Sequence, residues 1–156
     1  MKFHVADGED YYKHLQNIKM KLEGPIGPRG KTGIAGVKGS PWVDLAPDIC
    51  RQRIILEGTL HNPFGPENMV RYCEEITKVL NMTYVGAPVC NFEPHYGWCA
   101  YMHWKESGLH IYGWDHRKPP FFSIDVYTCK PFDPMDAVRY TEQFFEENLI
   151  KLTWKE

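Results

Sequence analysis

The sequence predicts an α+β fold: a small two-layer sandwich in which two helices cover one face of a largely antiparallel sheet. Two observations indicate this class. Short apolar or alternating segments of strand length outnumber the two segments with helical periodicity, and residues 51–156 suffice for one small hydrophobic core. We summarise the element order as βαβββαβ, preceded by a short helix and a collagen-like Gly-X-Y segment.

The predicted elements start with a strand over Arg53–Leu60 and a helix over Pro66–Leu80. Four apolar positions of this helix share one face, because they are three or four residues apart: Met69, Cys73, Ile76 and Leu80. Between this helix and the next, strands are expected over Thr83–Phe92, Gly97–Trp104, Leu109–Trp114 and Phe121–Thr128.

The second helix has a strong start signal. Asp133 is placed as the N-cap, Pro134 as the first helical residue and Asp136 in the first turn. The side chains expected to face the core are Ala137, Val138, Thr141, Phe144 and Phe145. A last strand over Leu149–Trp154 completes the predicted sheet.

The charge balance argues against nucleic-acid and membrane partners. Eighteen Lys and Arg residues stand against twenty Asp and Glu residues, so the net charge of −2 supplies no field that attracts phosphates. No apolar run reaches the ~18–20 residues that span a bilayer, and Met1–Asp10 lacks the features of a secretory signal. We expect a cytoplasmic protein or a virion component, without membrane insertion.

Five cysteines without a C-x-x-C pair disfavour a disulfide framework, and we interpret them as reduced thiols, mostly in the core. A possible metal cluster consists of Cys99, His103, His110 and His116. Their spacings match no usual zinc pattern, so we predict no metal site.

Upstream of the domain, glycine recurs at every third residue through six triplets, at Gly24, Gly27, Gly30, Gly33, Gly36 and Gly39. Only glycine fits at the common axis of three polyproline II chains, so this period predicts a collagen-like rod of roughly 55 Å. A flexible Gly-rich linker is the alternative, although a linker needs no fixed period.

A short coiled coil is predicted before the collagen-like segment. Tyr11, Leu15, Ile18 and Leu22 are spaced like a coiled-coil seam, with Asp10 as the cap. Together the two segments predict a trimeric stem; a lone amphipathic helix folded onto its own domain is the alternative. The chain is thereby divided into an N-terminal strand and short helix (1–23), a collagen-like stem (24–41), a linker (42–50) and a folded domain (51–156).

Three blocks of the folded domain resemble the prokaryotic S-adenosylmethionine decarboxylases. Glu106–Trp114 reads ESGLHIYGW, Ile124–Cys129 reads IDVYTC, and Asp133-Pro134 opens the second helix, in the order and spacing of that family. The likeness extends from Arg51 to about Phe145. It implies that Ser107 attacks the carbonyl of Glu106, that the chain is cut there, and that Ser107 becomes a pyruvoyl cofactor.

The resemblance also assigns roles at the substrate site. It makes Cys129 the proton donor to the decarboxylated carbon, Glu57 an acidic residue that holds the substrate, and Phe92 and Trp114 the aromatics around adenine. Taken without the family, these residues read as a small buried thiol, a solvent-facing carboxylate and two packing aromatics.

Two departures from the family pattern concern the cutting reaction. The histidine expected five residues after the serine is Tyr112, and the one expected directly after it is Gly108. A phenol is a poor proton acceptor at neutral pH. His110 shares a strand face with Tyr112 and is the candidate replacement base.

Two functions follow. In the first, the domain is unprocessed and non-catalytic, and its stem forms a homotrimer that serves as a structural or attachment module, such as a phage fibre contacting other virion proteins. In the second, it is an active pyruvoyl-dependent S-adenosylmethionine decarboxylase of spermidine biosynthesis, cut between Glu106 and Ser107. The stem and Tyr112 favour the first.

Overall fold

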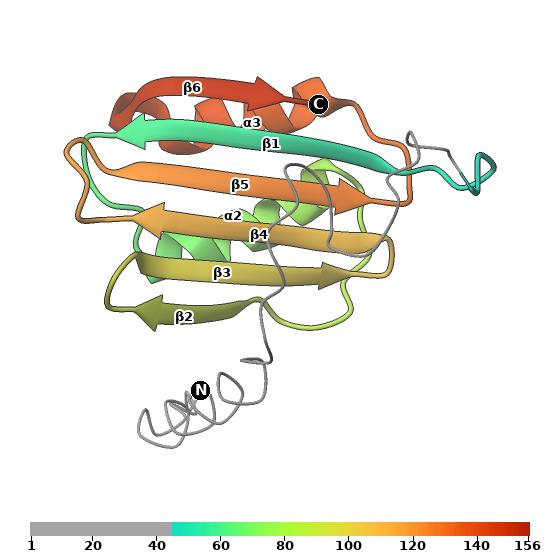
Figure 1. Ribbon diagram of the computed structural model, residues 1–156, viewed down its shortest axis with the longest axis horizontal. Helices are drawn as coiled ribbons and strands as arrows, with labels where there is room; N and C mark the ends of the chain where they lie inside the picture. The colour runs from blue at the N-terminus through green and yellow to red at the C-terminus, as the bar shows by residue number, and fades with distance from the viewer. Residues whose placement is uncertain (1–44) are drawn as a thin grey trace, which may run out of the picture. The chain divides into compact units, whose positions relative to one another are not determined.

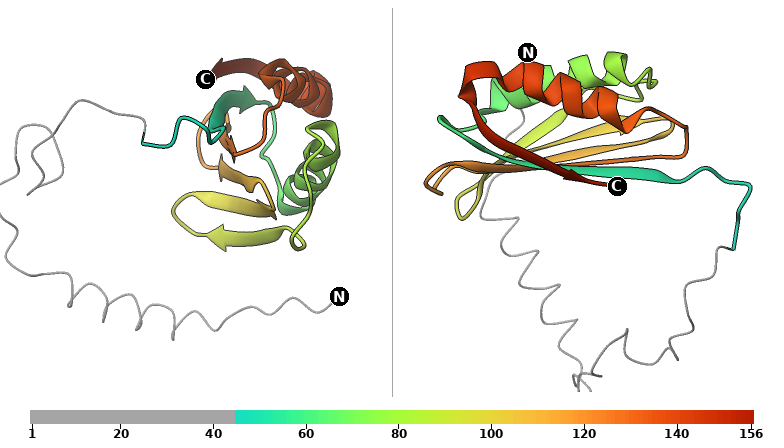
Figure 2. Two further views of the ribbon diagram at one scale, coloured as in Figure 1. Left: turned by 90° about the vertical axis from the view of Figure 1, so that its right-hand side faces the viewer. Right: turned by 90° about the horizontal axis from the view of Figure 1, so that it is seen from above.

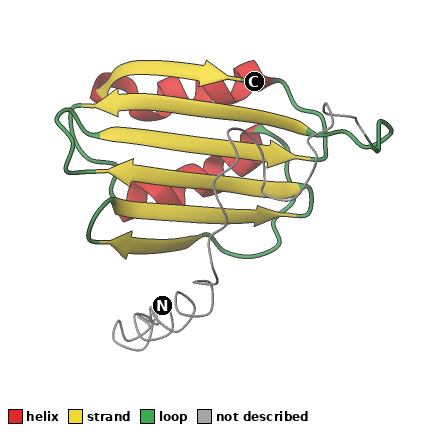
Figure 3. Ribbon diagram, in the orientation of Figure 1, coloured by secondary structure: helices red, strands yellow, loops and turns green. Residues whose placement is uncertain are grey.

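The computed structural model describes residues 45–156, and the predicted coiled-coil and collagen-like segments lie outside them. The described part contains six strands, two α-helices and a short 3-10 helix (Figure 3). In chain order these are β1 (Gln52–Leu60), α2 (Pro66–Val79), β2 (Val89–Glu93), β3 (Gly97–Trp104), β4 (Ser107–Trp114), β5 (Phe121–Thr128), α3 (Pro134–Phe145), η1 (Glu146–Asn148) and β6 (Leu149–Lys155).

All six strands form one antiparallel sheet in the spatial order β2-β3-β4-β5-β1-β6. Both helices lie on the same face of this sheet, which gives two layers (Figure 1, Figure 2). The predicted α+β class is therefore confirmed. The summary βαβββαβ has three strands between the helices, whereas the structure has four, β2 to β5. The four ranges predicted there each form a separate strand.

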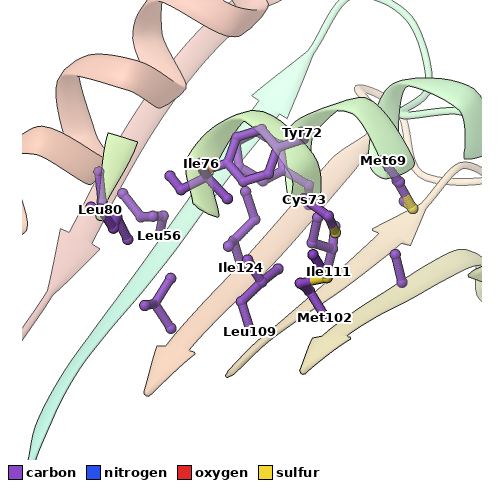
Figure 4. Close-up of a cluster of buried hydrophobic side chains, with 14 of the residues drawn as sticks. Leu56, Met69, Tyr72, Cys73, Ile76, Leu80, Met102, Leu109, Ile111 and Ile124 are labelled. Carbon is purple, nitrogen blue, oxygen red and sulfur yellow. The ribbon is translucent and has the colours of Figure 1, made fainter. Parts of the chain in front are cut away.

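Helix α2 begins with Pro66 at its N-terminus and ends at Val79, with Leu80 as the C-cap. The four residues predicted to share its inner face are all buried, and Tyr72 joins them. Figure 4 shows this row facing the strands, where Leu109 and Ile124 are among its partners. The helical spacing of apolar residues thus placed the core correctly.

Helix α3 confirms the predicted start signal. The side chain of Asp133 accepts a hydrogen bond from the main-chain N–H of Met135 at 2.9 Å, and Pro134 is the first helical residue. Of the side chains expected to face the core, Phe144 is only half-buried, and it packs against the edge of the aromatic ring of Tyr72.

The strand predicted over Thr83–Phe92 is too long at its start. Only Val89–Glu93 is a strand, and Tyr84 makes an isolated bridge to Trp104. Pro88 precedes the strand and has no N–H to donate to a ladder, which explains why the pairing does not extend further back. At the other end of the hairpin, β4 starts two residues before the predicted Leu109.

The sheet has one covered and one open face, because residues alternate along each strand. On β4, Leu109 and Ile111 are fully buried under the helices, whereas His110 and Tyr112 point to the opposite side. We call that side the open face; Figure 1 looks onto it. The site predicted from the sequence has to be judged by which face each residue occupies.

Candidate functional site

The peptide bond between Glu106 and Ser107 lies at the tight turn that joins β3 to β4. Both carboxylate oxygens of Glu106 are bound by Thr83, one by its main-chain N–H at 3.0 Å and the other by its hydroxyl at 2.9 Å. These hydrogen bonds, the main-chain one first, lower the pKa of the Glu106 carboxyl group. The turn is therefore anchored by an ionised side chain at neutral pH.

Ser107 has an unusual backbone conformation, with a φ angle of 128°. Residues other than glycine rarely adopt such values, and the strain costs on the order of 1–3 kcal/mol. Pairing on both sides fixes the residue, because Ser107 lies opposite Trp104 on β3 and Thr128 on β5. The strain is thus located beside the bond at which the family resemblance predicts cutting.

The carbonyl oxygen of Glu106 accepts a hydrogen bond from the main-chain N–H of Cys129 at 2.8 Å. Residue 129 comes directly after Thr128, so the β4–β5 register brings its N–H to this position. The Cys129 thiol is exposed and free. A carbonyl held by a fixed N–H donor is suited to stabilising negative charge that develops on its oxygen.

A pocket of about 280 Å³ opens beside Ser107 on the open face. Its lining includes five ionisable side chains from three neighbouring strands, β3, β4 and β5. The full set is Tyr101, His103, Ser107, Gly108, His110, Asp125 and Tyr127. Asp125 is bound through both oxygens by Arg53 of β1, at 2.8 and 2.5 Å, so its charge is paired.

A sequence model of the S-adenosylmethionine decarboxylase family matches residues 64–154, which is more than half of the chain. The chain belongs to the S-adenosylmethionine decarboxylase family. No curated protein matches it. The match covers the turn, the pocket and both helices, so the geometry described above belongs to the region shared with other family members.

In this decarboxylase-family domain, Tyr112 lies away from the Glu106–Ser107 bond. It is five residues along β4 from Ser107, a rise of roughly 17 Å, and does not line the pocket. It is about half exposed, lies opposite Cys99 on β3, and stacks on His110 with ring centroids 6.3 Å apart. A side chain at this position cannot reach Ser107 of the same chain.

The residues assigned to the substrate are spread over the sheet. Glu57 is exposed on the open face of β1, opposite Ser123 and two strands away from Tyr112. Phe92 pairs with Trp98 on β2–β3, and their rings are 5.1 Å apart on the helix-covered side. Trp114 lies on the open face, with its ring 5.1 Å from that of Phe121.

Phe92 and Trp114 therefore occupy opposite faces of one sheet, and no slot between them exists within a single chain of this decarboxylase-family domain. A predicted adenine slot that uses both rings would therefore need a second chain. Trp114 is the ring on the same face as the pocket.

Sequence reasoning missed three features of the site: Thr83, which holds Glu106, the main-chain N–H of Cys129, and His103. The period of two along β3 was the available signal for His103, because it puts this residue on the face of His110. The Cys129 N–H acts through a main-chain atom and Thr83 through a contact with a residue 23 positions away, and neither leaves a local sequence signal.

The cysteines and the rest of the described chain offer no metal centre. Only Cys73 is buried, and burial raises the pKa of its thiol to about 12 and that of Cys90 to about 11. Over residues 45–156, no three His, Cys, Asp or Glu side chains come close enough to hold a metal ion. None of the helices in that range has the length and apolarity that a membrane crossing demands.

Proposed function

We propose that the chain cuts itself between Glu106 and Ser107 and then acts as a pyruvoyl-dependent decarboxylase. S-adenosylmethionine is the substrate that the family name indicates. The observation that supports this proposal best is the 2.8 Å hydrogen bond from the Cys129 N–H to the Glu106 carbonyl oxygen. It provides a pre-placed donor where negative charge develops during attack on that carbonyl.

In the first step, Oγ of Ser107 bonds to the carbonyl carbon of Glu106 while the amide C–N bond breaks, and the Oγ proton ends on the freed nitrogen. Elimination then removes the Cα proton of Ser107 and breaks its Cβ–O bond, which releases the new main-chain carboxylate of Glu106 and leaves a dehydroalanine, an enamine. Hydrolysis of the resulting enamine consumes one water, releases one ammonia and leaves a pyruvoyl group. The strained φ of Ser107 favours the first step, because breaking the amide relieves it.

The described residues are compatible with a pyruvoyl group at position 107. The position borders a pocket, and Cys129, whose main-chain N–H binds the Glu106 carbonyl, has an exposed free thiol. A pyruvoyl carbonyl supplies an electron sink for a departing carboxylate, which no standard side chain offers. Cys129 is then the proposed proton donor, and Glu57 and Trp114 lie on the same open face as candidates for holding the substrate.

Intact mass measured under denaturing conditions tests the proposal. The wild-type chain is expected to give two fragments, residues 1–106 and 107–156, and Ser107→Ala only the whole chain. Ser123→Ala, a serine on β5, is the matched control and is expected to be cut like wild type. A wild-type chain that stays whole, with no ester trapped by hydroxylamine, rejects the proposal.

A second candidate is the unprocessed, non-catalytic domain, used as a trimeric structural or attachment module of a virion. In the sequence, Tyr112 supports it by replacing the family's processing histidine, although position 112 is out of reach of Ser107 within one chain. The separation of Phe92 from Trp114 favours it as well. In that case the wild-type chain stays whole and S-adenosylmethionine does not bind at millimolar concentration.

A further inference from the structure

We propose that His103 is the proton acceptor for Ser107 when the chain is cut, an inference that rests on the proposed function. The first observation that supports this role is the strand register. His103 lies directly opposite Gly108, the residue next to Ser107, and Ser107 lies opposite Trp104, the residue next to His103. Opposed residues of an antiparallel pair have Cα atoms about 4.5–5.5 Å apart, so the main chain of His103 lies beside that of Gly108 and diagonal to that of Ser107.

The pocket supplies the second observation. His103, Ser107 and Gly108 all line it. An added Cβ at Gly108 would be 2.3 Å from the main-chain oxygen of Met102. No other residue fits there without a shift of the main chain, so position 108 contributes no side chain to the space between His103 and Tyr127, its two cross-strand neighbours.

The other candidates are farther along the strand. His110 is three residues from Ser107 on β4, a rise of roughly 10 Å, and Tyr112 is two residues farther. The His110 ring also stacks on Tyr101, with centroids 4.6 Å apart, whereas the His103 ring is 6.1 Å from Tyr101. His110 is thus committed to a stacked pair farther from the serine.

An imidazole suits the required proton transfer. It accepts the Oγ proton while the Oγ–carbon bond to Glu106 forms, and it returns that proton to the nitrogen when the C–N bond breaks, so the base is regenerated. The titratable or charged groups that share the open face around His103 come from its own strand and from three others: Tyr101 of β3, His110 of β4, Asp125 and Tyr127 of β5 and Arg53 of β1. Because Arg53 pairs with Asp125, this carboxylate is not a free base beside the serine.

The test measures the rate of chain cutting in the full-length protein between pH 5 and 9, by intact mass under denaturing conditions. His103→Gln is expected to lower the rate at least 100-fold at pH 8 and to flatten the dependence of the rate on pH. Added imidazole is expected to restore part of the rate. His95→Gln, in the turn between β2 and β3 at the other end of the sheet, is the matched control and should leave the rate unchanged.

The outcomes separate the role of His103 from the proposed function. If His103→Gln is cut at the wild-type rate, or if only His110→Gln is slow, the role of His103 is rejected while the proposed function stands. If the wild-type chain is not cut at any pH, both are rejected. Thermal unfolding of each variant separates a slow reaction from a lost fold, since a folded His103→Gln chain that responds to imidazole supports the inference.

Discussion

The indole N–H of Trp104 donates a hydrogen bond to the hydroxyl of Thr77 at 2.8 Å, and both side chains are fully buried. The same hydroxyl donates to the main-chain oxygen of Cys73 at 2.6 Å. The Trp104–Thr77 hydrogen bond joins helix α2 to Trp104, the last residue of β3, which lies two residues before Glu106. The position of the candidate cutting site therefore depends on the packing between the helix and the sheet.

Thr77→Val is expected to destabilise the domain by about 1–3 kcal/mol, because it leaves the Trp104 N–H buried without an acceptor. Urea unfolding followed by Trp fluorescence measures the change. Thr153→Val, an exposed threonine on β6, is the matched control and should change stability by less than about 0.5 kcal/mol. Equal stabilities for the two variants would show that the buried bond contributes nothing.

Gly108→Ala is expected to destabilise the domain by more than about 1 kcal/mol, because its Cβ would meet the Met102 oxygen at 2.3 Å. Gly86→Ala is the matched control, since nothing lies within 4 Å of its added Cβ. Thermal melts compare the two. The same clash means that replacing Gly108 by the family's histidine should not restore a base. A Gly108→Ala melt at or above the wild-type temperature would contradict this reading.

Glu106→Gln is expected to lower stability at neutral pH, with a difference from wild type that shrinks in acid. The pKa of Glu106 is lowered in the folded chain by the Thr83 hydrogen bonds. The Glu106 carboxylate therefore contributes fully to stability above its pKa in the unfolded chain. This contribution is lost as the pH falls through its pKa in the folded chain. Melting temperatures at pH 7 and pH 3 measure the difference; a gap that is the same at both contradicts the role of the ionised carboxylate.

Trp114→Ala is expected to weaken S-adenosylmethionine binding roughly fivefold, the equivalent of about 1 kcal/mol for one aromatic face. Phe92→Ala should leave the affinity unchanged, because Phe92 is on the other face of the sheet. Calorimetry on the full chain gives both affinities. An equal loss in both variants would mean that the rings meet across two chains.

Gly30→Asp is expected to abolish a trimer of the full-length protein, since the side chain would be placed at the axis of the predicted triple helix. Lys31→Ala changes a position that does not face this axis and is the matched control. Light scattering gives the mass of each assembly. A wild-type protein that is monomeric or dimeric at every concentration returns Gly24–Pro41 to the status of a linker.

Secondary structure was largely predictable, because its signals are local. The Asp133-Pro134 start of α3 and the spacing from Met69 to Ile76 depend on neighbours a few residues apart. The missing N-terminal part of the Thr83–Phe92 strand was harder to predict. Pro88 was a local signal against it, but the hydrogen bond from Thr83 to Glu106 joins residues 23 apart.

The candidate site was predictable only in part, because it depends on register. The motif identified Glu106 and Ser107, but the choice between His103 and His110 requires knowing that His103 lies opposite Gly108. The separation of Phe92 from Trp114 has the same cause, since a one-residue difference in register moves a side chain to the other face.

The place of β1 in the sheet determines what a cut would produce. Strands β1, β2 and β3 precede the Glu106–Ser107 bond and β4, β5 and β6 follow it, yet the spatial order is β2-β3-β4-β5-β1-β6. β1 is therefore bordered on both sides by strands of the other piece. The two pieces would be interleaved, so a cut molecule would keep its size and shape on a native gel and come apart only when the whole sheet unfolds.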